Sequence, residues 1–135
     1  MHLADWPEVE NSLIDHDLEA RWDRLIKLKE EVLKALEEKR IAKLIGSPLE
    51  AKVEITSGSK EELEFLSRYL PDLRYIFIVS HVGLEKGDKR EIRVAKADGK
   101  KCSRCWNWSA KVGSDNKHPT LCERCSSVVT EEISK

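Results

Sequence analysis

The sequence has 135 residues, of which 36% are charged and 6% are aromatic, and its formal net charge is -1. A chain of this length holds one ordinary domain or two or three small ones, and its core must be aliphatic and modest in size. The near-neutral charge argues against a strongly basic protein that binds nucleic acid on its own. No apolar run approaches the roughly 18 residues of a membrane span, and the N-terminus lacks the basic and apolar regions of a signal peptide. We therefore expect a cytoplasmic protein with no membrane partner.

A long helix is predicted within the first 47 residues. From Leu18 to Ile45 apolar residues recur at helical spacing, with Lys, Arg and Glu on the other faces. Asp17 is expected to cap its N-terminus, and Gly46 followed by Pro48 predicts its end. The apolar stripe of so long a helix needs a cover. The sequence allows three candidates for the surface that covers it: the next segment, a partner, or another part of a larger protein.

The following stretch, residues 48–98, predicts a small α+β layer. Three segments have the alternation or the β-rich composition of strands: 51–56, 75–79 and 91–97. Between the first two, Ser59 and Glu62 fit a capping box at the start of a second helix, which Pro71 is expected to end. The order strand, helix, strand, strand favours an α+β fold class in which this helix covers one face of the sheet.

All four cysteines lie in the last part of the chain, residues 99–135. They form two C-x2-C pairs separated by sixteen residues: Cys102, Cys105, Cys122 and Cys125. Two such pairs are typical of a zinc finger, in which four thiolates close a tetrahedral shell around one structural Zn2+. Two disulfides are the alternative, but nothing else in the sequence indicates secretion. His118 precedes a proline, so we expect it at the surface and not among the ligands.

Binding is the function that the remaining residues favour. The sequence contains no glycine-rich phosphate loop, no G-x-S-x-G and no H-E-x-x-H motif. Residues 86–124 contain eleven Lys and Arg against five Asp and Glu. Basic groups beside aromatic rings suit RNA, because phosphates supply affinity and unstacked bases lie on the rings. The predicted RNA contacts are Lys100, Lys101, Arg104, Trp108, Lys111, Lys117 and Arg124. Trp106 is expected to pack inside the zinc finger, whereas Trp108 is left open between core and surface.

Several motifs resemble a known family. KCSRCW and HPTLCERC resemble the zinc finger at the C-terminus of bacterial-type isoleucyl-tRNA synthetases, a pattern that the formamidopyrimidine-type DNA glycosylases share. HLADWPEV, the W-x9-V-x-K-A-L-E run at 22–37, K-x-I-G-x-x-L-E-A-x-V at 43–53 and FIVSHVGL resemble the same synthetases near the end of their anticodon-binding region. The resemblance therefore covers nearly the whole chain.

The resemblance implies a division of the chain and a function. Residues 1–47 would end the helical anticodon-binding region, 48–98 would form an α+β subdomain, and 99–135 would form the four-cysteine zinc finger. The family attaches isoleucine to its tRNA with ATP, using HIGH and KMSKS signatures that this sequence lacks. The implied role is therefore to help hold the tRNA near its anticodon, without a catalytic centre, and the implied partners are that tRNA and the rest of the synthetase.

Two other functions are compatible with the sequence. The chain could be a protein-docking module that zinc holds together, with the long first helix as its contact surface. It could also be a zinc-finger protein of the DNA-glycosylase kind. Those enzymes use an N-terminal proline as the nucleophile, whereas this sequence starts Met1-His2.

Overall fold

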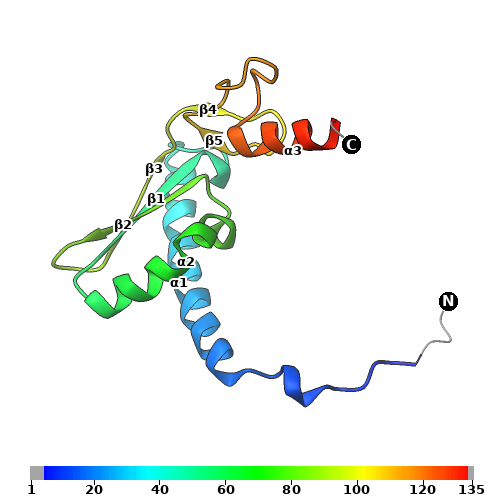
Figure 1. Cartoon of the computed structure of the whole chain (residues 1–135). Coiled ribbons are helices and arrows are strands. Elements are labelled where there is room, and N and C mark those ends of the chain that lie inside the picture. Colours follow the sequence, from blue (N-terminus) through cyan, green and yellow to red (C-terminus); the bar gives the residue numbers. More distant parts are fainter. Residues whose placement is uncertain (1–4, 134–135) are drawn as a thin grey trace.

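The computed structural model describes residues 5–133 (Figure 1). Its α-helices and strands, in chain order, are α1 (His16–Ile41), β1 (Ala51–Ser57), α2 (Lys60–Phe77), β2 (His81–Lys86), β3 (Glu91–Lys96), β4 (Lys100–Lys101), β5 (Trp108–Ser109) and α3 (Glu123–Ile133). Single 3-10 turns precede α1 and β1. The predicted α+β fold class is confirmed. No helix within the described part of the chain is both long and apolar enough to cross a membrane.

The main sheet has three strands in the order β2-β1-β3. The central strand β1 pairs in parallel with β2, reached through α2, and antiparallel with β3. Side chains alternate between the two faces of a strand. Val53 therefore shares a face with its partners Val82 and Val94, and this face belongs to the hydrophobic core. The predicted strands at 51–56 and 91–97 are both confirmed.

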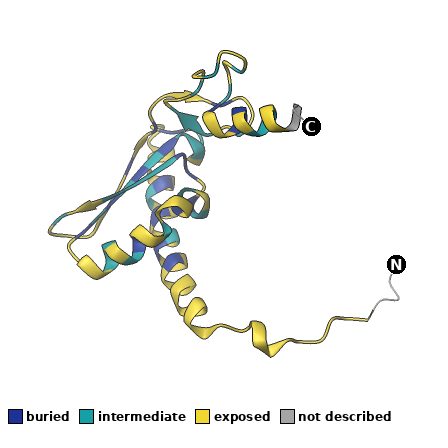
Figure 2. Cartoon of the chain, viewed as in Figure 1, coloured by how far each residue is buried: buried dark blue, intermediate teal, exposed yellow. Residues whose placement is uncertain are grey.

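Both long helices cover the same face of this sheet (Figures 1 and 2). The buried residues that the helices contribute are Leu25, Leu28, Val32 and Leu36 of α1 and Leu66, Leu73 and Phe77 of α2. The sheet thus covers the middle part of the apolar face of α1. The first turns of α1 lie beyond it, because Leu18 and Trp22 remain 40% and 42% exposed. Figure 2 shows this end of the helix as exposed surface.

The ends of α1 differ from the prediction. Asp15, not Asp17, caps the helix: its Oδ1 accepts a hydrogen bond from the backbone N–H of Leu18 at 2.9 Å. The helix ends at Ile41, four residues earlier than expected. Lys43 then adopts a left-handed conformation with φ 58°. This turn directs Ile45 back into the core, where it is 3% exposed, and that burial stabilises the turn after Ile41.

The second helix also corrects two predictions. Pro71 lies inside α2 and does not end it. Leu73 and Phe77 are spaced one helical turn apart and are fully buried, and their burial offsets the single backbone hydrogen bond that proline removes. The predicted strand at 75–79 is wrong for the same reason, since residues 75–77 form the last turn of α2. Ile78 ends the helix in a left-handed conformation, and β2 begins at His81.

The predicted capping box is half realised. Ser59 Oγ accepts the backbone N–H of Glu62 at 3.3 Å, as expected. The Glu62 carboxylate does not return to Ser59. It accepts a hydrogen bond from Ser57 Oγ at 2.6 Å and lies 3.4 Å from Arg90 Nε. The start of α2 is therefore tied to the end of β1 and to the loop between β2 and β3.

Candidate metal centre and nucleic-acid interface

The four cysteines converge on one point. Cys102 directly follows β4, Cys105 lies in the turn after it, Cys122 precedes α3, and Cys125 lies in the first turn of that helix. Their Sγ atoms all lie within 4.8 Å of one another. A tetrahedral zinc ion with Zn–S bonds of about 2.3 Å needs sulfurs about 3.8 Å apart, and the Cys105 and Cys122 sulfurs are 3.7 Å apart. The cluster therefore fits a single structural Zn2+, and His118 is not part of it.

Backbone N–H groups prepare this site for negative charge. Burial raises the pKa of the Cys102 thiol, but hydrogen bonds from the N–H groups of Cys105, Cys122 and Arg104 outweigh it and lower that pKa to about 6. The Cys122 N–H lies 3.3 Å from the Cys102 sulfur. Burial, together with the neighbouring cysteine sulfurs, raises the pKa of the Cys122 thiol to about 12. Four sulfurs around one ion would leave no open coordination position, which is the arrangement of a structural zinc site.

Each C-x2-C pair forms a knuckle, residues 102–105 and 122–125, and the arginine inside each knuckle interacts with the Cys125 sulfur. Arg104 Nη1 is 3.9 Å from the sulfur of Cys125. Arg124, next to Cys125 in the chain, donates from Nη1 to the phenolic oxygen of Tyr75 at 3.2 Å. Tyr75 and the Cys125 sulfur together raise the pKa of Arg124. The two knuckles thus hold two guanidinium groups in place, and that of Arg124 reaches the end of α2.

The two tryptophans of the finger differ in solvent exposure. The prediction that Trp106 packs inside the finger is wrong: it is 58% exposed, and the Lys101 Nζ lies 4.4 Å from its ring centroid. Its backbone N–H closes the knuckle turn on the Cys102 carbonyl at 3.0 Å, and its φ of 67° is left-handed. Trp108 is half-buried, and its indole N–H is buried without a partner among the described residues.

The lysines predicted to contact RNA are all exposed. Lys100 and Lys101 form β4, while Lys111 and Lys117 lie on the loop between β5 and α3. In the structure Lys101 lies over the Trp106 ring, and Arg104 and Arg124 both interact with the Cys125 sulfur. Lys111 and Lys117 contact none of these residues. Sequence reasoning missed Arg74 and Tyr75, because only the fold brings the end of α2 to the second knuckle.

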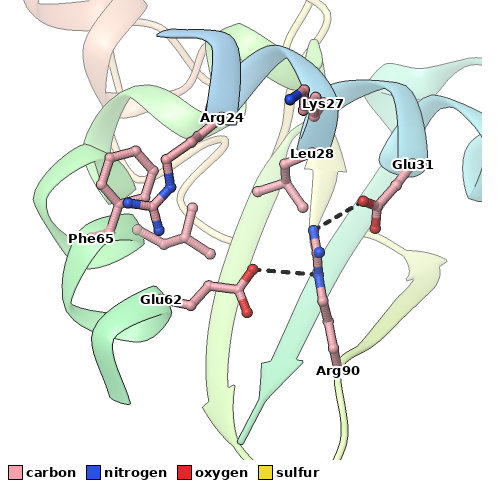
Figure 3. Close-up of a pocket in the computed structure, with 8 residues that line it drawn as sticks. Arg24, Lys27, Leu28, Glu31, Glu62, Phe65 and Arg90 are labelled. Atoms are coloured by element: carbon pink, nitrogen blue, oxygen red, sulfur yellow. Dashed lines mark ion pairs between the residues drawn. The ribbon is translucent and has the colours of Figure 1, made fainter. Parts of the chain in front are cut away.

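A second polar cluster joins α1, α2 and the loop after β2 (Figure 3). Arg90 extends between two carboxylates, with Nη2 3.1 Å from Glu31 and Nε 3.4 Å from Glu62. Arg24 lies over the Phe65 ring at 4.1 Å. These residues line a cavity of about 210 Å³. The Arg90 charge is paired with both carboxylates, so this residue ties three elements together.

Comparison with known proteins adds an independent finding. Residues 99–128 match the family model of the zinc finger found in FPG and IleRS. Over 136 residues the chain is 40% identical to an isoleucine–tRNA ligase of Kosmotoga olearia, covering 96% of this chain. It is 42% identical over 143 residues to one of Symbiobacterium thermophilum and 41% identical over 138 residues to one of Staphylococcus carnosus, covering 94% and 97% of this chain. The chain spans 15% of the length of each of these relatives.

Proposed function

Because the chain belongs to the isoleucine–tRNA ligase family, we propose that it is the C-terminal, zinc-bearing part of such a ligase and helps to hold the isoleucine tRNA near its anticodon. In this proposal the whole enzyme joins isoleucine to the tRNA with ATP in the cytoplasm, and the catalytic centre lies outside these residues. The division into 1–47, 48–98 and 99–135 stays a prediction.

One observation carries the tRNA proposal: the exposed Trp106 ring with the Lys101 ammonium group over it. A left-handed backbone costs an ordinary residue about 1–2 kcal/mol, and glycine avoids that cost. The chain nevertheless has tryptophan at this position, with most of its ring in solvent. An unstacked base gains about 1–3 kcal/mol on an aromatic ring, and the ammonium group attracts the adjoining phosphate.

Zinc supports this surface without taking part in chemistry. We propose Cys102, Cys105, Cys122 and Cys125 as its ligands, since their sulfurs form the four-membered cluster. The ion, when bound, holds both knuckles in fixed positions. The side chains at residues 104, 106 and 124 then meet RNA already ordered, so that less conformational entropy is lost on binding.

A titration of the zinc-loaded chain tests the proposal. Isoleucine tRNA, a tRNA for another amino acid and duplex DNA are compared at a series of salt concentrations. We expect the isoleucine tRNA to bind most tightly, with an affinity that falls as salt rises. Absence of binding to every nucleic acid would reject a direct RNA contact. Binding that is equal for tRNA and duplex DNA would reject recognition of the anticodon.

A second function, docking on another protein segment, rests on a different surface. Apolar side chains before and at the start of α1 are exposed: Trp6, Val9, Leu13, Ile14, Leu18 and Trp22. Trp6 is the most exposed of these residues, at 94%. We propose that this surface packs on the remainder of the ligase. Double substitution of Leu18 and Trp22 by Ser should then lower the stability of the full-length enzyme and leave that of the isolated chain nearly unchanged.

A further inference from the structure

The junction between α2 and the zinc finger holds an aromatic side chain between two arginines. Tyr75 lies in the last turn of α2. Its phenolic oxygen accepts hydrogen bonds from Arg74 Nη2 at 2.5 Å and from Arg124 Nη1 at 3.2 Å. Both guanidinium groups also lie near the ring, 4.6 Å and 5.8 Å from its centroid. We refer to these three residues as the Arg74–Tyr75–Arg124 cluster.

Once the hydrogen bonds within this cluster are formed, its remaining polar groups are all hydrogen-bond donors. A phenolic oxygen has two lone pairs, and here the two arginines occupy both. The hydroxyl hydrogen of Tyr75 therefore remains to be donated, and within residues 5–133 it has no acceptor. Guanidinium groups can only donate, and each has further N–H groups available. The cluster is thus complementary to a group that offers several acceptor oxygens.

The charge of the cluster indicates the same kind of ligand. Two guanidinium groups hydrogen-bond to one oxygen, and the like charges repel each other. In the part of the chain that the structure describes, neither Arg74 nor Arg124 forms an ion pair with a carboxylate, and the Cys125 sulfur is the other group that interacts with Arg124 besides Tyr75. Tyr75 is 48% exposed, so a ligand can reach it. Arg74 and Tyr75 also line an open depression of about 490 Å³ that Asp72 and His81 border.

The knuckles continue this basic surface. Arg104 Nη1 lies 3.9 Å from the Cys125 sulfur, directly beside the residue that carries the second guanidinium group of the cluster. Two guanidinium groups therefore share the Tyr75 hydroxyl, and a third reaches the residue next to Arg124 in the chain. Guanidinium groups on both sides of Cys125 suit a polymer that carries more than one phosphate better than they suit a single small anion.

We propose that the Arg74–Tyr75–Arg124 cluster binds a phosphodiester group of RNA, with Arg104 placed for a neighbouring phosphate. The guanidinium groups donate to the phosphate oxygens in pairs, and the Tyr75 hydroxyl donates to a further oxygen. This inference rests on the proposed tRNA-binding function. It adds the end of α2 to the RNA surface, so that the α+β layer and the zinc finger bind the same strand.

The experiment measures how affinity for the isoleucine tRNA anticodon stem-loop depends on salt. The zinc-loaded chain is compared with a double variant, Arg74→Gln with Arg124→Gln, and with Arg68→Gln as a control on an exposed residue of the same helix. We expect the double variant to bind about tenfold more weakly at low salt and to lose about 1 from the slope of log K against log salt. Tyr75→Phe should weaken binding and leave the slope unchanged. The Arg68 variant should match the parent chain.

The variants are compared only if their zinc content and circular dichroism spectra match those of the parent chain. Should the double variant not fold, Arg74→Gln alone gives the same test, because Arg74 lies outside the zinc finger. An unchanged slope and affinity would reject the phosphate site while the proposed function stood, and failure of the parent chain to bind would reject both. Arginine side-chain NMR signals that move with inorganic phosphate, but not with the stem-loop, would show a site for free anions and overturn the RNA assignment.

Discussion

Ser80 and Trp108 connect the sheet-bearing core to the zinc finger. Ser80 Oγ accepts the backbone N–H of Trp108 at 2.7 Å and donates to the carbonyl of Leu49 at 2.5 Å. Ser80 is 1% exposed, so water does not replace these bonds. One buried hydroxyl thus joins the chain before β1, the start of β2 and β5. Together with the contact between Tyr75 and Arg124, it sets how the finger lies against the α+β layer.

Replacing Ser80 with Ala should destabilise the protein by about 1–3 kcal/mol, because the Trp108 N–H would be left buried without an acceptor. Urea unfolding followed by tryptophan fluorescence measures this loss. Ser67→Ala is the matched control: its exposed hydroxyl donates to the Glu64 carbonyl within α2, and its removal should change stability by less than about 0.5 kcal/mol. Equal effects of the two substitutions would contradict a connecting role for Ser80.

Cys102→Ser should abolish stoichiometric zinc binding and unfold the finger. A serine hydroxyl is a poor zinc ligand, and the Cys102 sulfur also accepts the Cys122 N–H. Metal content by mass spectrometry should fall from one ion per chain to well below one. Ser114→Ala, an exposed change in the same finger, should keep its zinc. A Cys102→Ser chain that retains both the ion and the fold would refute the four-cysteine site.

Removal of zinc by a chelator should unfold the finger and leave the α+β core folded. The two regions have separate hydrophobic clusters, and the one shared by α1, α2 and the sheet contains no cysteine. Binding of structural zinc contributes about 10–16 kcal/mol in small fingers, and without it the finger cannot stay folded. Amide NMR spectra should therefore lose dispersion for residues 99–133 and retain it for β1 and β3. Loss of every dispersed signal would show instead that the core depends on the metal.

Trp106→Gly should weaken RNA binding and raise the stability of the zinc finger. Glycine adopts the left-handed φ of 67° without strain, so we expect the finger to gain about 1 kcal/mol in stability. Loss of the ring should cost about 1–3 kcal/mol of RNA binding. Trp106→Ala is the control, since it removes the ring but keeps the strain, and it should lose affinity without the gain in stability. Unchanged affinity in both variants would exclude Trp106 from the RNA surface.

Arg90→Gln should cost less than about 1 kcal/mol. Its side chain is 42% exposed, and the partners Glu31 and Glu62 are 49% and 22% exposed, so solvent screens both ion pairs. Thermal unfolding at low and high salt measures the change. The difference between the variant and the parent chain should shrink as salt rises. A loss of several kcal/mol that salt does not alter would mean that the cluster in Figure 3 acts through packing.

Features that depend on nearby residues could be predicted from the sequence. The spacing of Cys102, Cys105, Cys122 and Cys125 predicts a metal site because zinc imposes one geometry on four thiolates. Strict alternation along β1 and β3 identifies both strands. The capping role of Ser59 at the start of α2 is also predictable, since its hydroxyl accepts a backbone N–H within the first turn.

Tertiary contacts decided the rest. Burial of Phe77 extends α2 through Pro71, where composition had predicted a strand, because packing of a large apolar side chain outweighs one lost hydrogen bond. The buried bond from Trp108 to Ser80 holds one tryptophan against the core, and the knuckle turn leaves Trp106 in solvent. Tyr75 and Arg124 stand 49 positions apart in the chain and meet only in the fold. Local patterns carry no information about such pairs, because folding alone fixes the distance between them.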